Sequence, residues 1–372
     1  MKQTNGQQLI DLFEKWAPRS LAVEGDSVGL QIGTLNKPIS KVLVTLDVND
    51  KVIDEAIEQQ CELIIAHHPP IYKGLKNMRT DLPQGRLIEK LIKHNISVYA
   101  AHTNLDIATG GVNDLLANAL ELENVKILEQ TSAEKLMKLV VFTPKETTEL
   151  VRTAIANAGA GQLGAYSACS FTTSGEGRFK PSEDAKPYIG GANELSIVDE
   201  DRVEVVFPIS YKNRVLKAML SAHPYEEPAY DLLAMEIDVL EKGLGRVGLL
   251  REAVTLSDYA QIVKKQLNVP FVRVVGDLNR TVQKVAVLGG DGNKYIYAAK
   301  RAGADVFITG DLYFHVAQDA EALNLAVIDP GHHVEQIMKV GVAEYMNAEC
   351  ATKKLSCTFI ASNISTEPFQ LI

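Results

Sequence analysis

The sequence has few cysteines and no apolar run long enough to span a membrane. The four cysteines are scattered over 372 residues and form no CxxC pair, so neither disulfide bonds nor a thiolate zinc site are expected. A bilayer span needs roughly 20 consecutive apolar residues, and no such run is present. The N-terminus also lacks the apolar core of a signal peptide. We therefore expect a cytoplasmic protein with no membrane partner.

The sequence also has no excess of basic residues over acidic ones. Lys and Arg number 38 against 47 Asp and Glu, and the formal net charge is −9. This balance argues against nucleic acid as the main partner. The hydrophobic fraction of 46% is ordinary for a globular protein, and the length is sufficient for two or three domains.

Strands and helices alternate in the first third of the chain. Helices are expected at 6–16, 49–60, 84–94 and 111–120, and strands at 41–47, 63–66 and 96–101. This alternation predicts a mostly parallel α/β sheet. In such sheets, ligands bind beyond the carboxyl ends of the strands.

The middle of the chain has a different order of elements. Strands are expected at 135–143, 168–174, 202–209 and 229–237, and helices at 147–158 and 213–221. The order β-α-β followed by β-α-β is that of a ferredoxin-like α+β module, so we expect an inserted domain. Polar residues dominate its Gly175–Gly191 stretch.

The α/β pattern resumes after Gly243–Gly248. Helices are expected at 256–267, 293–302, 314–323 and 334–348, and strands at 281–288, 306–309, 326–328 and 358–361. The two α/β segments resemble two halves of one body. The expected fold is therefore α/β with the domain limits 1–128, 129–242 and 243–372.

Chemistry-bearing side chains follow three of these strands. His67 and His68 end the first, Asp106 follows the second, and His332 with Glu335 follows the third. Successive side chains of an extended segment point to opposite sides, so the two adjacent imidazoles suit two ions better than one. Residues three apart on a helix share a face, which places Glu335 beside His332.

Three imidazoles and two carboxylates suit zinc, manganese, iron, cobalt or nickel better than calcium or magnesium. Five ligands fill two coordination shells only if a carboxylate bridges and water completes them, which is typical of catalytic sites. The alternative is that these residues only cap strand ends and loops.

Other features have a structural and a functional interpretation. His102 and His315 are candidates for proton transfer or for contacts to ligands, and each could equally be a plain loop or helix residue. The Gly289–Asn293 turn could hold an anion but is more typical of a simple tight turn. For His223, which lies directly before Pro224 in a stretch that ends at Pro228, a loop role is favoured over weak metal binding.

Several of these motifs resemble those of the Nif-three-like dinuclear-metal proteins, which are known as type-2 GTP cyclohydrolase I homologues. Asp26–Gly33 (DSVGLQIG) is similar to the signature DNVGLQVG, with Ser27 in place of Asn. The family elements HHP, HTNLD and GH…E have their counterparts at His67–Pro69, His102–Asp106 and Gly331–Glu335. The matches cover the first and last domains.

The resemblance implies that two divalent metal ions, with zinc favoured, are held by His67, His68, Asp106, His332 and Glu335, with Glu335 as the bridge. Glu335 is three residues after His332 and two after His333, a tighter spacing than in many short members, and His332 is the expected ligand. The insert resembles the PII/CutA-like module of longer members, including the stretch His223–Leu232 (HPYEEPAYDL). The resemblance also implies a toroidal homohexamer with the metal sites facing a cavity.

Two functions remain open at this stage. The first is a metal-dependent hydrolase of a nucleotide-like or phosphorylated small molecule, or a GTP cyclohydrolase-like enzyme. The second is a non-enzymatic metal-binding regulator or chaperone whose insert senses a ligand or partner.

Overall fold

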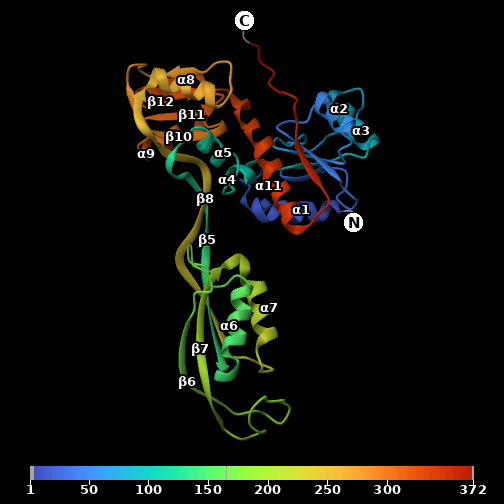
Figure 1. The fold of residues 1–372 in the computed structure, drawn as a ribbon, viewed down its shortest axis with the longest axis vertical. Coiled ribbons are helices and arrows are strands. Elements are labelled where there is room, and N and C mark those ends of the chain that lie inside the picture. The colour runs from blue at the N-terminus through green and yellow to red at the C-terminus, as the bar shows by residue number, and fades with distance from the viewer. Residues whose placement is uncertain (1–3, 165, 371–372) are drawn as a thin grey trace. The chain divides into compact units, whose positions relative to one another are not determined.

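The computed structural model describes residues 4–164 and 166–370 (Figure 1). The chain divides into two compact units, and each is described here by itself. The first unit is formed by the chain up to Ser132 together with the chain from Lys242, and the second is Ala133–Glu241. In the described part of the chain, no helix has the length and apolar character needed to cross a membrane.

The first unit contains a five-stranded sheet in the order β1-β4-β3-β2-β13. All neighbours pair in parallel except β1, an antiparallel edge strand. The central strands β3 and β4 are buried along their whole length, as expected for parallel strands covered on both faces. The strands are β1 (Gly29–Ile32), β2 (Lys41–Thr45), β3 (Leu63–Ala66), β4 (Ser97–Ala100) and β13 (Thr358–Ala361).

The same unit contains a second sheet, in which β10, β11 and β12 are parallel and are flanked by antiparallel β8 and β9. The part of β8 from Lys242 onward belongs to this unit. The strands are β8 (Tyr230–Thr255), β9 (Arg273–Val275), β10 (Thr281–Asp291), β11 (Val306–Gly310) and β12 (Ala326–Asp329).

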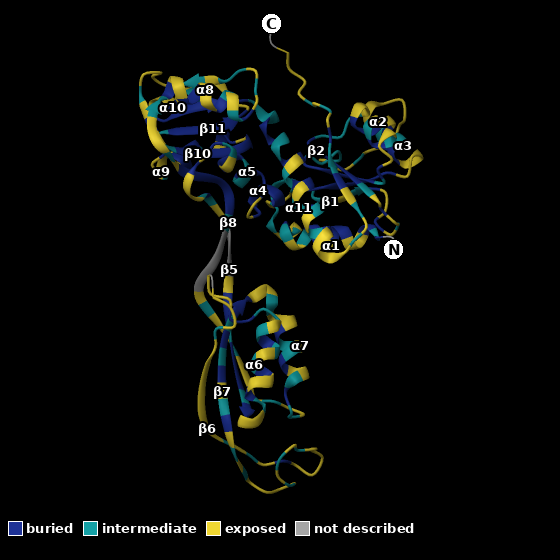
Figure 2. Cartoon of the chain, in the orientation of Figure 1, coloured by how far each residue is buried: buried dark blue, intermediate teal, exposed yellow. Residues whose placement is uncertain are grey.

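Helices cover both sheets of the first unit. One shared core joins the sheets and includes residues of α1, α5, α8 and α11, while α2 with α3 and α9 with α10 pack in two further cores (Figure 2). Asn5 caps the first helix with its side chain, and Gln8 reciprocates in a capping box. The helices are α1 (Gly6–Trp16), α2 (Asp50–Glu58), α3 (Pro83–Lys93), α5 (Val112–Ala119), α8 (Leu256–Gln266), α9 (Ile296–Arg301), α10 (Phe314–Ala322) and α11 (Ile337–Lys353).

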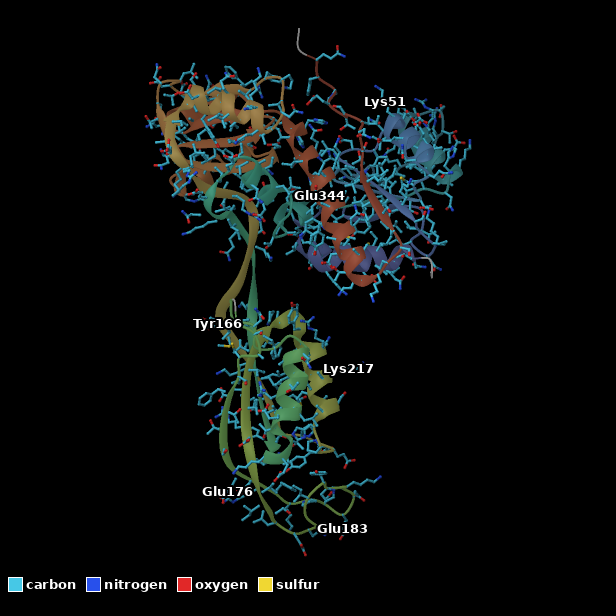
Figure 3. The ribbon with its side chains drawn as sticks, viewed as in Figure 1. Lys51, Tyr166, Glu176, Glu183, Lys217 and Glu344 are labelled. Atoms are coloured by element: carbon cyan, nitrogen blue, oxygen red, sulfur yellow. The ribbon has the colours of Figure 1, made fainter. Side chains whose placement is uncertain are left out.

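The second unit has the element order β5, α6, β6, β7, α7, β8, and its sheet order is β6-β7-β5-β8. Its core lies between the two helices and the sheet and includes Val151, Val205 and Phe207. On α7, Val215 is buried and Lys217 is exposed, as in an amphipathic helix (Figure 3). The elements are β5 (Glu123–Pro144), α6 (Thr148–Asn157), β6 (Phe171–Phe179), β7 (Ser196–Pro208) and α7 (Lys212–Ala222).

The predicted mixed α/β architecture is confirmed, and most predicted elements differ from the observed ones only at their ends. The strands predicted at 135–143 and 229–237 are too short. The first is part of β5, which begins at Glu123, and the second is part of β8, which ends at Thr255. The domain limits that the sequence predicted, after residues 128 and 242, fall inside β5 and β8. Gly243 and Gly248 do not form a turn: a Cβ at either would lie within 3.0 Å of a β5 carbonyl oxygen, so these glycines allow close approach of the two strands.

Two local predictions next to the candidate site also need correction. No helix was expected between the strand at 96–101 and the helix at 111–120, but Asp106 lies in the short helix α4 (Thr103–Ile107), where its neighbours Leu105 and Ile107 are buried. The last long helix was expected from Val334. It begins at Ile337, after a 3-10 turn at His332–Gln336. Strand β9 was not predicted.

Candidate metal centre

The first unit brings five predicted ligand residues together at strand ends. His67 and His68 follow β3 directly, Asp106 lies in α4 after β4, and His332 and Glu335 lie in the 3-10 turn after β12. In a 3-10 turn, side chains three residues apart eclipse each other. The Nε2 atom of His332 is accordingly 3.1 Å from the Oε2 atom of Glu335.

These residues form two groups that share Glu335. In one, His67 Nε2 lies 3.5 Å from Asp106 Oδ1 and 3.6 Å from Glu335 Oε1. In the other, His68 Nε2 lies 3.0 Å from Glu335 Oε2, which His332 also faces. The two oxygens of Glu335 therefore face different histidine groups, an arrangement suited to a bridging carboxylate.

Each of the three histidines is held by its other ring nitrogen. The Nδ1–H group of His67 donates to the carbonyl oxygen of Ala101 at 2.8 Å. Those of His68 and His332 donate to the carboxylates of Asp47 at 2.6 Å and Asp311 at 2.7 Å. Because these acceptors fix the proton on Nδ1, the lone pair of Nε2 is directed into the cluster, as is typical of metal-binding histidines.

The interior of the cluster contains polar atoms without partners. His67 is fully buried, and both its Nε2 atom and Asp106 Oδ1 lack a hydrogen-bond partner. Leaving buried polar atoms unpaired costs about 1–3 kcal/mol each. A cation between these two atoms would satisfy both, so the residues present fit the metal ions that the resemblance implies.

Electrostatics within the cluster favour charged forms. Burial lowers the pKa of His67, but the carboxylates of Asp106 and Glu335 outweigh burial and raise it above its ordinary value. Burial likewise opposes protonation of His68 and His332, and hydrogen bonds to Glu335 and to their aspartate partners raise their pKa values to about 10 and about 9. Without metal, protons thus occupy the positions that cations would take.

Burial raises the pKa of Asp106 above its ordinary value. It also acts to raise the pKa of Glu335, but the surrounding imidazoles hold that pKa well below its usual range. The shared carboxylate is therefore ionised at neutral pH, which is the form that a bridging ligand requires.

The glycine-rich turn at the end of β10 packs against this cluster. A Cβ atom at Gly290, where φ is +66°, would lie 2.7 Å from Glu335 Oε1 and 3.2 Å from His332 Nε2. A Cβ at Gly289 would meet the same glutamate at 3.1 Å. This turn was considered as an anion site, but its contacts make it a wall of the candidate metal centre.

His102 lies beside the cluster. Its ring centroid is 5.3 Å from that of His67 and 5.7 Å from that of His68. The expected hydrogen bond to a ligand is not among its described contacts, and its Nδ1–H group donates to Asp26 Oδ1 at 2.8 Å instead. Asp26 Oδ2 accepts from the backbone N–H and the hydroxyl of Thr103. His102 therefore presents Nε2 near the centre.

The remaining histidines lie elsewhere in their units. His315 is exposed on the first turn of α10, where its Nδ1 atom lies 3.1 Å from Gln318 Oε1, and no described contact joins it to the cluster. The Nε2 atom of His333 accepts from the backbone N–H of Thr366, so His332 is the member of the pair that faces Glu335. His223 is buried in the second unit and donates to the Phe142 carbonyl oxygen.

Three site residues were missed in the sequence. Asp26, Asp47 and Asp311 each hold an imidazole, and none was predicted as a site residue, although Asp26 begins the DSVGLQIG motif. For Asp47 and Asp311 a signal was available, because Asp311 directly follows β11, Asp47 lies two residues after the end of β2, and each of these strands neighbours a histidine-bearing strand. Asp311 also adopts a φ of +53°, a conformation that aspartate tolerates better than most residues.

Comparison with known proteins agrees with the motifs. Residues 4–368 match the family model of Duf34/NIF3 (NGG1p interacting factor 3). A Bacillus subtilis protein named "GTP cyclohydrolase 1 type 2 homolog" is 57% identical over 371 residues, and its Listeria monocytogenes namesake is 46% identical over 371 residues; both matches cover each chain in full.

Solved structures give the same result. A Bacillus cereus protein related to NIF3 is similar with a TM-score of 0.96 and 49% identity, and Staphylococcus aureus protein SA1388 with a TM-score of 0.80 and 33% identity. Both matches cover the two chains completely. The resemblance predicted from the sequence motifs is confirmed: the chain belongs to the Duf34/NIF3 family.

Proposed function

We propose that the protein binds two divalent metal ions and hydrolyses a nucleotide-like or phosphorylated small molecule. His67, Asp106 and Glu335 would hold one ion, and His68, His332 and Glu335 the other. Zinc suits this mixture of imidazole and carboxylate best, and iron, manganese, cobalt or nickel are also compatible. The observation that carries the proposal is the convergence of three anchored Nε2 atoms on the two oxygens of one buried glutamate.

The chain's own residues supply orientation and proton transfer. A pair of such ions, when bound, activates water and polarises phosphoryl or carbonyl oxygens. Asp26 holds Nδ1–H of His102, so Nε2 is free to accept a proton from the attacking water and return it to the leaving group. The exposed position of His315 on α10 makes His102 the better candidate for this role.

Metal content of matched variants tests the ligand assignment. Wild-type protein loaded with zinc should contain two zinc ions per chain by inductively coupled plasma mass spectrometry. The Glu335→Gln variant should contain neither ion. His332→Gln should lose one, whereas His333→Gln, a change of the adjacent residue, should retain two. Circular dichroism checks folding in each case. Equal loss in the His332 and His333 variants would contradict the assignment.

Turnover tests the enzymatic part separately. Zinc-loaded wild type should hydrolyse GTP or a member of a panel of phosphoesters, and His102→Gln should reduce kcat about 100-fold or more while retaining both ions. A metal-replete wild type that turns over none of these compounds would exclude hydrolysis of the tested substrates.

The alternative is a metal-binding regulator or chaperone. The observation in its favour is the second unit, which has its own core and a cavity that none of the candidate metal ligands lines. We propose that this unit is a ferredoxin-like module of the PII/CutA-like type, on the basis of its element order β-α-β-β-α-β. Metal-dependent capture of a defined partner by an inactive wild type would favour this alternative.

We extend the proposal to the assembly and its location. A toroidal homohexamer with the centres facing a cavity, in which a small-molecule ligand binds, would match the family resemblance. Light scattering should then give six times the 40.7 kDa of one chain, and a monomeric mass would reject the hexamer. Cytoplasmic localisation remains part of this proposal, and cell fractionation tests it.

A further inference from the structure

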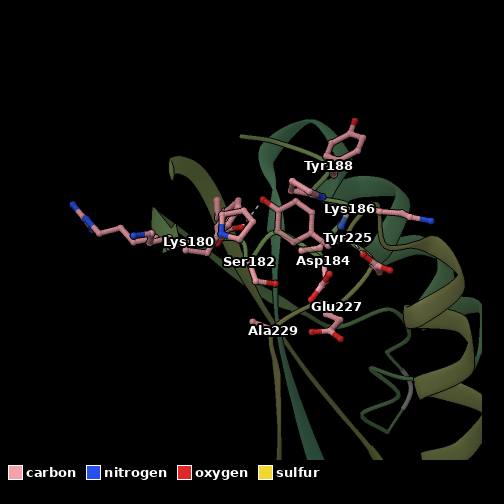
Figure 4. A pocket seen from close by; sticks show the side chains of 15 residues that line it. Lys180, Ser182, Asp184, Lys186, Tyr188, Tyr225, Glu227 and Ala229 are labelled. Atoms are coloured by element: carbon pink, nitrogen blue, oxygen red, sulfur yellow. Dashed lines mark hydrogen bonds between the residues drawn. The ribbon is translucent and has the colours of Figure 1, made fainter. Parts of the chain in front are cut away.

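A cavity of about 460 Å³ opens at one end of the second unit (Figure 4). Small-molecule sites have volumes of about 300–1,000 Å³. One wall is the connection from β6 to β7, residues 180–195, which contains neither helix nor strand. Structureless connections of this length are uncommon in compact domains and often bind ligands.

This connection is held in a defined shape. The backbone N–H of Asn193 donates to the carbonyl oxygen of Pro181 at 2.8 Å and closes the connection on itself. The N–H of Lys186 donates to the carboxylate of Glu226 at 3.1 Å, which ties it to the loop after α7. The cavity therefore has two fixed walls.

Aromatic rings line the cavity. The ring of Tyr225 lies edge-on to Phe179 at 5.8 Å between centroids and tilted to Tyr188 at 6.2 Å. Tyr188 is 60% exposed, so much of its ring is open to a ligand. Tyr188 belongs to the connection after β6 and Tyr225 to the loop after α7, and Figure 4 shows their side chains near each other.

A largely buried carboxylate also lines the cavity. Glu200 on β7 is 9% exposed and accepts a hydrogen bond from the Tyr225 hydroxyl at 2.8 Å. Gly177 on the neighbouring strand leaves room for it, since a Cβ there would lie 2.0 Å from Glu200 Oε2. Among the described residues no cation is within ion-pair distance of Glu200. Burial and the bond to Glu200 raise the pKa of Tyr225, which keeps its hydroxyl a donor.

The charges around the opening favour a positive ligand over an anion. Asp184, Glu226 and Glu227 add carboxylates to the lining. Of the three cationic lining residues, Arg178 is paired with Glu176 at 2.6 Å, and Lys180 and Lys186 extend away from Tyr225 (Figure 4). Aromatic faces and a desolvated carboxylate together are the groups that recognise ammonium and guanidinium ions.

We propose that this cavity binds a small organic cation, an amine or guanidinium compound whose charged group sits against Tyr188 and Tyr225 and pairs with Glu200. This site lies wholly within the second unit and shares no residue with the candidate metal centre. The proposal therefore holds whether or not the metal centre is catalytic.

Calorimetric titration of the full-length chain with spermidine, agmatine and choline tests the proposal, with ATP as the anionic probe. At least one cation should bind saturably at one site per chain, and ATP should not displace it. Tyr188→Ala should weaken binding about fivefold or more. Glu200→Gln, which keeps an acceptor for Tyr225, should weaken it at least as much.

Tyr166→Ala is the matched control, because Tyr166 is an exposed tyrosine of the same unit that does not line the cavity (Figure 3). It should bind the cation as wild type does. Absence of binding by all three cations would overturn the proposal. So would ATP binding that competes with the cation, or equal affinity of wild type, Tyr188→Ala and Glu200→Gln.

Discussion

The ring nitrogen that each histidine presents determines what the candidate metal centre can bind. An unanchored imidazole can rotate and exchange tautomers, whereas Nδ1 of His67, His68 and His332 is fixed by an oxygen acceptor. His102 is fixed in the same way but lacks a carboxylate facing its Nε2 within the described hydrogen bonds. This difference separates three candidate ligands from a candidate proton carrier.

Asp26→Asn should lower the free energy of unfolding by about 2 kcal/mol at neutral pH. The Asp26 side chain is 5% exposed, and although burial opposes ionisation, its bonds to His102 and Thr103 lower its pKa from 3.8 to about 2. Because folding lowers this pKa, ionised Asp26 stabilises the folded protein fully at pH values above 3.8. This contribution disappears as the pH falls through about 2.

Urea unfolding of metal-free wild type and Asp26→Asn tests this at neutral pH and again at roughly pH 3. The difference in stability between the two proteins should narrow at the lower pH. A constant difference across this range would show that the ionised form of Asp26 is not what stabilises the fold.

The sequence predicts the candidate ligands of this centre better than it predicts the residues that hold them in place. His67, His68 and His332 were selected because strand ends converge in a parallel sheet, and this rule needs no side-chain detail. Asp47 and Asp311 act through contacts between neighbouring strands, so they become recognisable only once the strand order is known.

At the scale of elements, the end of β10 shapes the candidate metal centre, because its two glycines have no side chains that would crowd Glu335. Gly290 combines a positive φ with contact to the shared glutamate, and Gly303, which follows α9, has a similar φ of +73° in open surroundings. Substituting alanine at each of the two positions therefore distinguishes the cost of backbone strain from the cost of crowding at the candidate site.

Gly290→Ala should destabilise the first unit by about 1–2 kcal/mol from backbone strain, with a further 1–3 kcal/mol, roughly, from crowding of Glu335. It should also lower the metal content. Gly303→Ala should show only the strain, because its nearest neighbour, Lys284 Nζ, would be 3.6 Å from the new Cβ. Chemical denaturation and metal analysis of both variants measure these effects. Equal losses of stability and metal in the two variants would exclude a steric role for Gly290.

Local patterns also explain which elements could be predicted. Helix α1 and strands β3 and β13 have the predicted bounds, because apolar periodicity and their flanking residues specify their ends. The full lengths of β5 and β8 were not foreseen, and in β8 the reason is that glycines that allow close packing of two strands look like turn residues in the sequence.

At the scale of the whole molecule, the five candidate ligands all belong to one of two units that have separate hydrophobic cores. A ligand that binds only the folded form stabilises what it binds, by about 2.7 kcal/mol at 100 times its dissociation constant. Metal removal is therefore expected to affect the first unit and to leave the intrinsic stability of the second unchanged.

The single tryptophan allows this to be measured in the intact chain. Trp16 is in the first unit and stacks on Tyr345 at 4.0 Å between ring centroids, so its fluorescence reports unfolding of that unit. Chelation should lower the thermal midpoint of Trp16 fluorescence, and added zinc should restore it. Hydrogen exchange of α6 and α7, in the second unit, should be the same with and without chelator. An unchanged fluorescence midpoint in protein shown to have lost its metal would mean that the ions do not bind at the five strand-end ligands.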